Sequence, residues 1–137
     1  MNAKKTGSKR AAFPDLGALD VCLNVKHLKT SIDFYTRLGF EKAEGEPSKG
    51  WAVLARDGVR IGLFRGFIPK NTLNFRGGDI GKIVGALKRR GLKPYDIRLR
   101  GADGVGNAML KDPDGNPIFF DTTPEERKAR IRAAKPK

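Results

Sequence analysis

Short apolar runs that alternate with polar residues dominate the chain, and glycine-rich turns separate them. Between Leu19 and Val25 every second residue is apolar, which is typical of a strand with one polar face. Apolar residues then recur at helical spacing over residues 28–37, and Gly39 ends this predicted helix. The pattern therefore begins with a strand that runs directly into a helix.

Two further apolar runs follow a polar segment that extends to Gly50. The runs cover residues 51–56 and 59–64, and Asp57-Gly58 lies between them. Because Asp-Gly between apolar runs favours a tight turn, the two runs predict a β-hairpin.

The same order of elements then returns. A short strand at residues 72–76 precedes Asp79, a residue suited to cap the amphipathic helix that begins at Ile80. Three more strands are predicted at residues 95–100, 107–111 and 117–121. The chain therefore reads β-α-β-β-β twice.

The turn before the last strand has the sequence Asp112-Pro113-Asp114-Gly115-Asn116. Proline presets one backbone angle, while glycine and asparagine tolerate a left-handed one. The segment therefore predicts a hairpin between the last two strands.

Two sets of motifs resemble the vicinal oxygen chelate superfamily. They are Phe34-Tyr35 with Leu38-Gly39-Phe40, and Asp112 to Asn116. The superfamily includes glyoxalases, extradiol dioxygenases, fosfomycin-resistance enzymes and bleomycin-resistance proteins. The resemblance implies an α+β fold in which two βαβββ modules form an open, cup-shaped mixed β-sheet with helices on the convex face. It also implies a homodimer.

The resemblance covers about residues 18–122, with modules at about 18–66 and 71–122. Residues 1–17 and 123–137 are predicted to be basic tails, with a short helix allowed from Arg127 to Ala134. The tails carry much of the net charge of +13. This charge supports a third reading of the function, in which the tails bind nucleic acid or another polyanion.

Enzymes of the superfamily bind a divalent metal in the cup through histidine and glutamate. In this chain the four corresponding positions hold Asp20, Gly62, Thr72 and Phe119. Glycine and phenylalanine offer no side-chain ligand, and threonine is a weak one. The only histidine, His27, lies at a helix start and is expected to be exposed. No metal or other cofactor is therefore expected, and the sequence favours a binding protein over an enzyme.

Alternation along the strands separates the side chains under the helices from those in the cup. The residues expected under the helices are Val21, Leu23, Val25, Ile61, Leu63, Leu73, Phe75, Ala108, Leu110, Ile118 and Phe120. The residues predicted to bind a ligand are Asp20, Asn24, Arg60, Phe64, Thr72, Asn74, Arg76, Met109, Phe119 and Asp121. Charged and apolar groups together suit a small organic molecule. If that molecule is an anion, Arg60 and Arg76 are the expected recognition residues.

The function expected from the sequence is metal-independent binding of a small polar or aromatic molecule, for sequestration, resistance or sensing. The alternative is a lyase, isomerase or dioxygenase with a displaced metal site. No apolar run approaches the roughly 20 residues that a membrane span needs. A single cysteine, Cys22, excludes an internal disulfide. A cytoplasmic location is expected.

Overall fold

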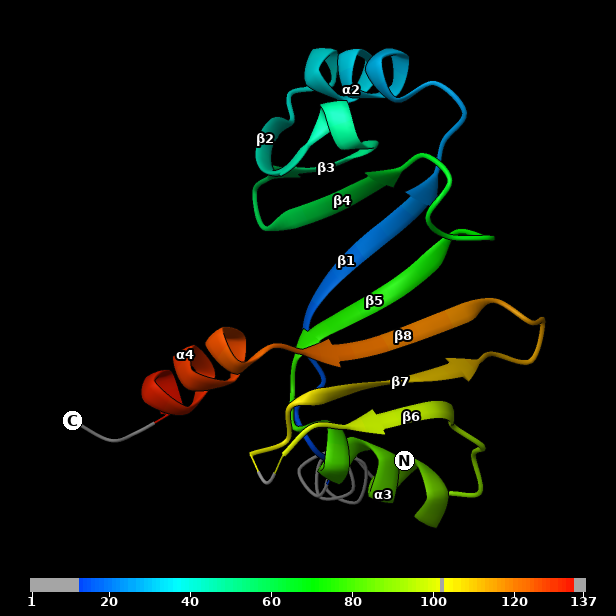
Figure 1. The fold of residues 1–137 in the computed structure, drawn as a ribbon, viewed down its shortest axis with the longest axis vertical. Coiled ribbons are helices and arrows are strands. Elements are labelled where there is room, and N and C mark those ends of the chain that lie inside the picture. The colour runs from blue at the N-terminus through cyan, green and yellow to red at the C-terminus, as the bar shows by residue number, and fades with distance from the viewer. Residues whose placement is uncertain (1–12, 102, 135–137) are drawn as a thin grey trace, which may run out of the picture. The chain divides into compact units, whose positions relative to one another are not determined.

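A mixed, open β-sheet and three α-helices make up the fold in the computed structural model, which describes residues 13–101 and 103–134 (Figure 1). The elements are β1 (Gly17–Asn24), α2 (Leu28–Arg37), β2 (Glu41–Glu46), the 3₁₀ helix η1 (Pro47–Lys49), β3 (Trp51–Arg56), β4 (Val59–Phe64), β5 (Thr72–Gly77), α3 (Ile80–Arg89), β6 (Tyr95–Leu99), β7 (Gly106–Lys111), β8 (Pro117–Thr122) and α4 (Pro124–Ala134). The hydrogen-bonded order is β2-β3-β4-β1-β5-β8-β7-β6. The predicted α+β class is confirmed.

Two compact units share this chain. One, called the α2 unit, consists of Leu19–Asn74 and Lys111–Ile118. The other, called the α3 unit, contains the segment that ends at Ala18, then Phe75–Leu110 and the chain from Phe119 onward. Each unit has its own helix and its own buried side chains, so each is described by itself.

The core of the α2 unit lies between its helix and one face of its strands. Leu28, Phe40, Leu54 and Leu63 are buried together, and Leu23, Val25, Ile32, Tyr35 and Ile61 pack against them. The predicted helix-facing positions Leu23 on β1, Val25 just after it, and Ile61 and Leu63 on β4 are therefore confirmed. Leu38, just past the helix end, is 57% exposed.

The core of the α3 unit follows the predicted helical spacing. Ile80, Ile83, Val84 and Leu87 are buried on α3, and the Asp79 side chain accepts a hydrogen bond from the Lys82 amide, as expected of a cap. Phe75 stacks on Phe120 with ring centroids 5.8 Å apart. The pairing of these rings places them on one face of the β5 and β8 strands, as predicted.

Two sequence expectations about the strands need correction. The polar segment before Gly50 contains strand β2, which is held by antiparallel pairing with β3 rather than by apolar alternation of its own. Leu73 was expected under a helix but is 40% exposed. The contacts of α2 are with β2, β3 and β4, so Leu73 on β5 lies beyond the cover of the helix.

The C-terminal segment predicted as a tail contains α4, which begins three residues before the short helix that the sequence allowed. Lys4, Lys5, Lys9 and Arg10 of the predicted N-terminal tail lie outside the described residues, as do positions 135–137.

Among residues 13–101 and 103–134, no helix combines the length and the apolar character needed to cross a bilayer.

The Asp112 turn predicted from the sequence forms as expected. Asp112 Oδ1 accepts hydrogen bonds from the amides of Asp114 at 2.9 Å and Asn116 at 2.8 Å, and Oδ2 accepts one from Asn116 Nδ2 at 2.8 Å. Gly115 has a φ of 85°, which is the left-handed region that favours glycine. These bonds, led by that of the Asn116 side chain, lower the pKa of Asp112.

A lowered pKa means that the folded state holds this proton less tightly than the unfolded chain. The turn's contribution to stability is therefore present above the ordinary carboxyl pKa and is lost as the pH falls through the lowered value. We expect Asn116→Ala to raise the pKa of Asp112 toward its ordinary value in an NMR pH titration. Asn107→Ala, outside this turn, serves as the control. An unchanged Asp112 titration in Asn116→Ala would contradict the assignment of cause.

Candidate functional site

The strands of the α2 unit present a second face, turned away from α2, that carries polar and aromatic side chains. Parallel pairing of β1 with β4 sets Asp20 beside Arg60, Cys22 beside Gly62 and Asn24 beside Phe64. Antiparallel pairing of β3 adds Trp51 opposite Phe64 and Val53 opposite Gly62. We call this set the polar face. Its members alternate with the helix-facing core residues, as strand geometry requires.

An ion network occupies one end of the polar face. Asp20 is 3% exposed, and its carboxylate accepts hydrogen bonds from Arg60 Nε at 2.7 Å and Nη2 at 3.3 Å. Arg60 Nη2 also donates to Glu44 Oε2 at 2.5 Å. The hydrogen bond to Asp20, more than any other contact, raises the pKa of Arg60. The Asp20 carboxylate therefore serves as an ion-pair partner of Arg60.

Aromatic rings occupy the other end of the polar face. Trp51 and Phe64 stack with parallel planes and centroids 6.1 Å apart. Phe67, which is 59% exposed, meets Phe64 edge to face at 6.2 Å. These arrangements are favourable geometries for aromatic pairs. Trp51 thus contributes a ring to the aromatic end of the polar face.

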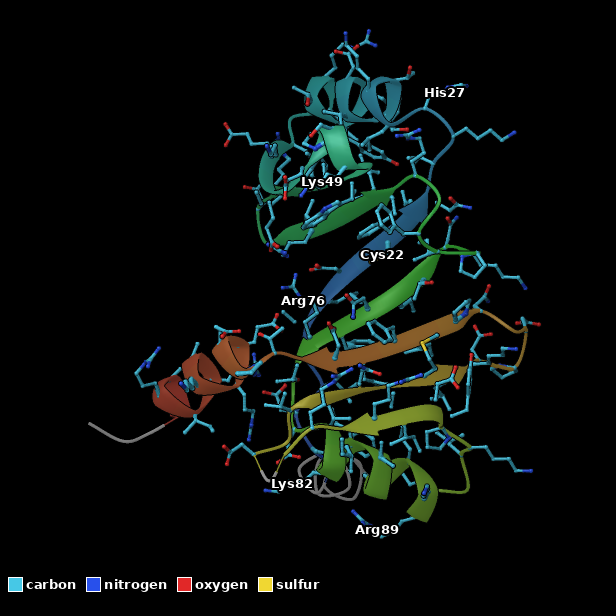
Figure 2. All side chains as sticks on the ribbon, viewed as in Figure 1. Cys22, His27, Lys49, Arg76, Lys82 and Arg89 are labelled. Carbon is cyan, nitrogen blue, oxygen red and sulfur yellow. The ribbon has the colours of Figure 1, made fainter. Side chains whose placement is uncertain are left out.

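Small side chains lie between the ionic and aromatic ends. A Cβ atom placed on Gly62 would lie 2.7 Å from Phe64 Cε2 and 3.5 Å from Cys22 Sγ. The Phe64 ring therefore packs directly over Gly62 and fills the space that a longer residue would need. Cys22 is buried on β1 (Figure 2) beside this glycine.

The residues at the family's metal positions do not fit a metal ion. Asp20 is engaged by Arg60, and the space at Gly62 is taken by a ring. Thr72 Oγ1 donates to the Lys70 carbonyl oxygen at 2.9 Å, and Phe119 has no ligand atom. Within the described part of the chain, no group of three or more His, Cys, Asp or Glu side chains could hold a metal.

The other predicted site residues divide between the two units. Asn24 and Asn74 lie in the α2 unit, where the Asn24 amide donates to Asn71 Oδ1 at 2.8 Å. The remaining predicted residues lie in the α3 unit and are half-buried on β5, β7 and β8: Arg76, Met109, Phe119 and Asp121.

Two glutamates that sequence reasoning missed hold the two predicted arginines. Glu44 lies on the unpredicted strand β2 and binds Arg60. Glu126 lies on α4, and its Oε2 accepts from Arg76 Nε at 2.9 Å and Nη2 at 2.7 Å. The spacing Thr123-x-x-Glu126 was a detectable signal, because it is the signature of a helix capping box.

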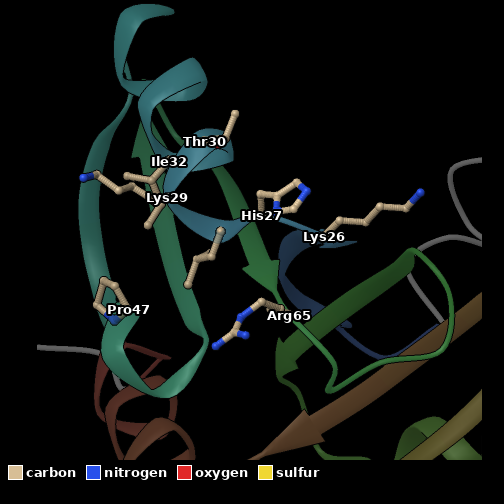
Figure 3. Close-up of a pocket in the computed structure, with 8 residues that line it drawn as sticks. Lys26, His27, Lys29, Thr30, Ile32, Pro47 and Arg65 are labelled. Atoms are coloured by element: carbon tan, nitrogen blue, oxygen red, sulfur yellow. The ribbon is translucent and has the colours of Figure 1, made fainter.

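A separate hollow of about 560 Å³ lies beside the start of α2 (Figure 3). Its lining is Lys26, His27, Leu28, Lys29, Thr30, Ile32, Pro47 and Arg65, none of which was predicted as a site residue. Arg65 directs its guanidinium below the first turn of α2, whereas Lys26 and Lys29 extend in different directions (Figure 3). The charges of this hollow therefore do not converge on one point. His27 is exposed, as expected, and does not cap the helix with its side chain.

Comparison of the sequence with models of protein families identifies the family of this chain. The model of the Glyoxalase/Bleomycin resistance protein/Dioxygenase superfamily matches residues 17–120. The chain belongs to this superfamily, which confirms the resemblance noted from its motifs. A search of curated proteins finds no match.

Solved structures share the fold at low sequence identity. The chain is similar to an NAD-dependent benzaldehyde dehydrogenase from Legionella pneumophila, with a TM-score of 0.60 and 19% identity over 76% of this chain and 97% of that one. A superfamily member from Vibrio splendidus 12B01 gives 0.56 and 18%, covering 76% and 96%. A variant of homoprotocatechuate 2,3-dioxygenase from B. fuscum gives 0.54 and 19%, covering 80% of this chain and 33% of that one. At these identities the likeness shows the fold alone.

Removal of the Arg60 side chain is expected to destabilise the α2 unit strongly. Arg60→Ala deprives the buried Asp20 carboxylate of its guanidinium partner, and the loss of one member of such a pair costs about 3 kcal/mol. The measurement is the free energy of unfolding in urea. Arg56→Ala is the control, because Arg56 lies at the end of β3 and is ion-paired with the exposed Asp57.

Asp20→Asn combined with Arg60→Ala should recover part of the loss, since no buried carboxylate then remains at position 20. Equal costs for Arg60→Ala and Arg56→Ala would contradict the importance given to the Asp20–Arg60 pair.

Proposed function

We propose that the polar face of the α2 unit binds a small polar or aromatic molecule without a metal ion. The observation that carries this proposal is the packing of the Phe64 ring over Gly62. A side chain at position 62 would displace this ring, so the glycine that offers no metal ligand also leaves the ring in place as apolar surface. Such surface suits an organic ligand.

The aromatic end of the face supports recognition of a planar group. Trp51 and Phe64 already lie parallel, and the exposed ring of Phe67 borders Phe64. A ligand ring that stacks here gains about 0.5–1.5 kcal/mol beyond the apolar area that it buries.

The ionic end of the face selects the charge of the ligand. The carboxylates of Asp20 and Glu44 and the guanidinium of Arg60 together carry a net charge of −1. Arg60 Nε and Nη2 are engaged, whereas Nη1 has no partner in the described part of the chain. The face therefore favours a neutral or cationic aromatic molecule with a hydrogen-bond acceptor for Nη1, rather than the anion first considered for Arg60.

Membership of the superfamily supports the same kind of use. Its model covers glyoxalase, bleomycin-resistance and dioxygenase proteins. For this chain, the proposed use is sequestration, resistance or sensing of the bound molecule by a homodimer.

The fluorescence of Trp51, the only tryptophan of the chain, reports directly on this face. We expect members of a panel of neutral aromatic amides, beginning with benzamide, to change it on binding. Phe64→Leu should weaken the best binder by about tenfold, because the stacking partner is lost.

Phe34→Leu is the matched control, since Phe34 is an exposed aromatic residue on α2 and lies away from the polar face. Its affinities should equal those of the unmodified protein. Loss of binding in both variants, or in neither, would count against a site at Phe64.

Binding is also expected to be independent of divalent metals. After incubation with Ni²⁺, Zn²⁺, Mn²⁺ or Fe²⁺ and dialysis, the protein should retain far less than one equivalent of metal, because Gly62 and Phe119 have no ligand atom and Asp20 is paired with Arg60. The amide titration should be unchanged by EDTA. Stoichiometric retention with a higher melting temperature would instead favour the alternative of a metal-dependent lyase, isomerase or dioxygenase.

A further inference from the structure

Helix α4 has no apolar face with which to pack. Most of its residues are charged or alanine, and its one large aliphatic side chain, Ile131, is 38% exposed. Helices in proteins usually gain their stability from the burial of an apolar stripe. Something other than apolar burial therefore holds α4 on the α3 unit.

Ion pairs and hydrogen bonds supply that attachment. Arg127 Nε donates to the Asp103 carbonyl oxygen at 2.9 Å, and Arg127 Nη2 lies 3.7 Å from Asp79 Oδ2. Arg130 pairs with Asp15. Pairs of this kind contribute little each when they are partly exposed, and salt screens them. The attachment of α4 is therefore expected to be reversible.

Glu126 occupies a defined position within this attachment. Its Oε1 accepts a hydrogen bond from the Thr123 amide at 3.0 Å, while Thr123 Oγ1 accepts one from the Glu126 amide at 3.1 Å, which is a capping box. Its Oε2 lies on the Nε–Nη2 edge of Arg76. A carboxylate of a separate molecule would take the same edge of a guanidinium.

Arg76 lies at the end of β5, next to Gly77 (Figure 2). Gly77 has a φ of 101°, and a Cβ there would lie 2.5 Å from Arg130 Cδ. A side chain at position 77 would therefore displace Arg130, and the left-handed φ itself favours glycine. Thr122 Oγ1 donates to the Gly78 carbonyl oxygen and fixes the chain just before α4.

We propose that the Nε–Nη2 edge of Arg76 is a binding site for the carboxylate of a small organic acid, and that Glu126 is its built-in competitor. An acid that binds there displaces Glu126, removes the capping box and loosens α4. This site belongs to the α3 unit and is additional to the binding function proposed for the polar face of the α2 unit.

Benzoate is the probe, and benzamide at the same concentration is its neutral control. NMR titration of the full chain should show Glu126→Gln binding benzoate about fivefold more tightly than the unmodified protein, because the competing charge is gone. Glu125→Gln, the neighbouring residue with no ion pair among those described, should bind like the unmodified protein. Arg76→Gln should lose the response.

Hydrogen exchange in the unmodified protein gives a second readout that needs no variant. Benzoate should accelerate exchange of the amides of residues 124–134 more than sodium chloride of equal ionic strength. If Glu126→Gln melts at a lower temperature yet gains no affinity over Glu125→Gln, and exchange responds equally to both salts, the pair is only structural and the proposal is wrong.

Phe64→Leu separates this proposal from the proposed function. It should weaken the binding of aromatic amides, followed by Trp51 fluorescence, about tenfold and leave the benzoate response intact. Loss of the benzoate response in Phe64→Leu would mean that the acid does not bind at Arg76, and this would overturn the proposal without touching the first one.

Discussion

The buried carboxylate of Asp20, which lies opposite Arg60, determines how the side chains at the ionic end of the polar face are arranged. A charged group as enclosed as Asp20 is costly unless a partner offsets the loss of water. The parallel register of β1 and β4 puts Arg60 directly beside it. The pair therefore depends on the register of these strands and fixes the position of the guanidinium. Glu44 then ties the edge strand β2 to the same arginine.

The sequence predicted those parts of this arrangement that follow from periodicity. Alternation placed Leu23 and Leu63 beneath α2 and put Asp20 and Arg60 on the other face, because a strand has only two faces. It missed Glu44, because β2 has no alternating apolar residues. This strand forms by pairing with β3. The packing of Phe64 over Gly62 was also beyond reach, since a side-chain rotamer leaves no trace in a pattern of residue types.

Glu126 was missed for a different reason. Residues 123–137 were read by their charge, and a basic run is commonly a solvated tail. The capping box at Thr123 shows that a short local signal outweighs composition here, because it satisfies amides that a helix start otherwise leaves open. The charged residues of α4 then become the means of attachment rather than evidence against it.

In both units a glutamate from a peripheral element binds an arginine. The two ion pairs differ, however, in how readily they are expected to dissociate. Arg60 is also bound by a carboxylate that water scarcely reaches, whereas Arg76 and Glu126 each keep about a quarter of their side chains exposed. The net charge of +13 draws anions toward the protein. On the polar face an approaching anion would meet the carboxylates of Asp20 and Glu44 beside Arg60. At Arg76 the departure of Glu126 would remove a negative charge from beside the guanidinium, so there the long-range field and the local change in charge would act together.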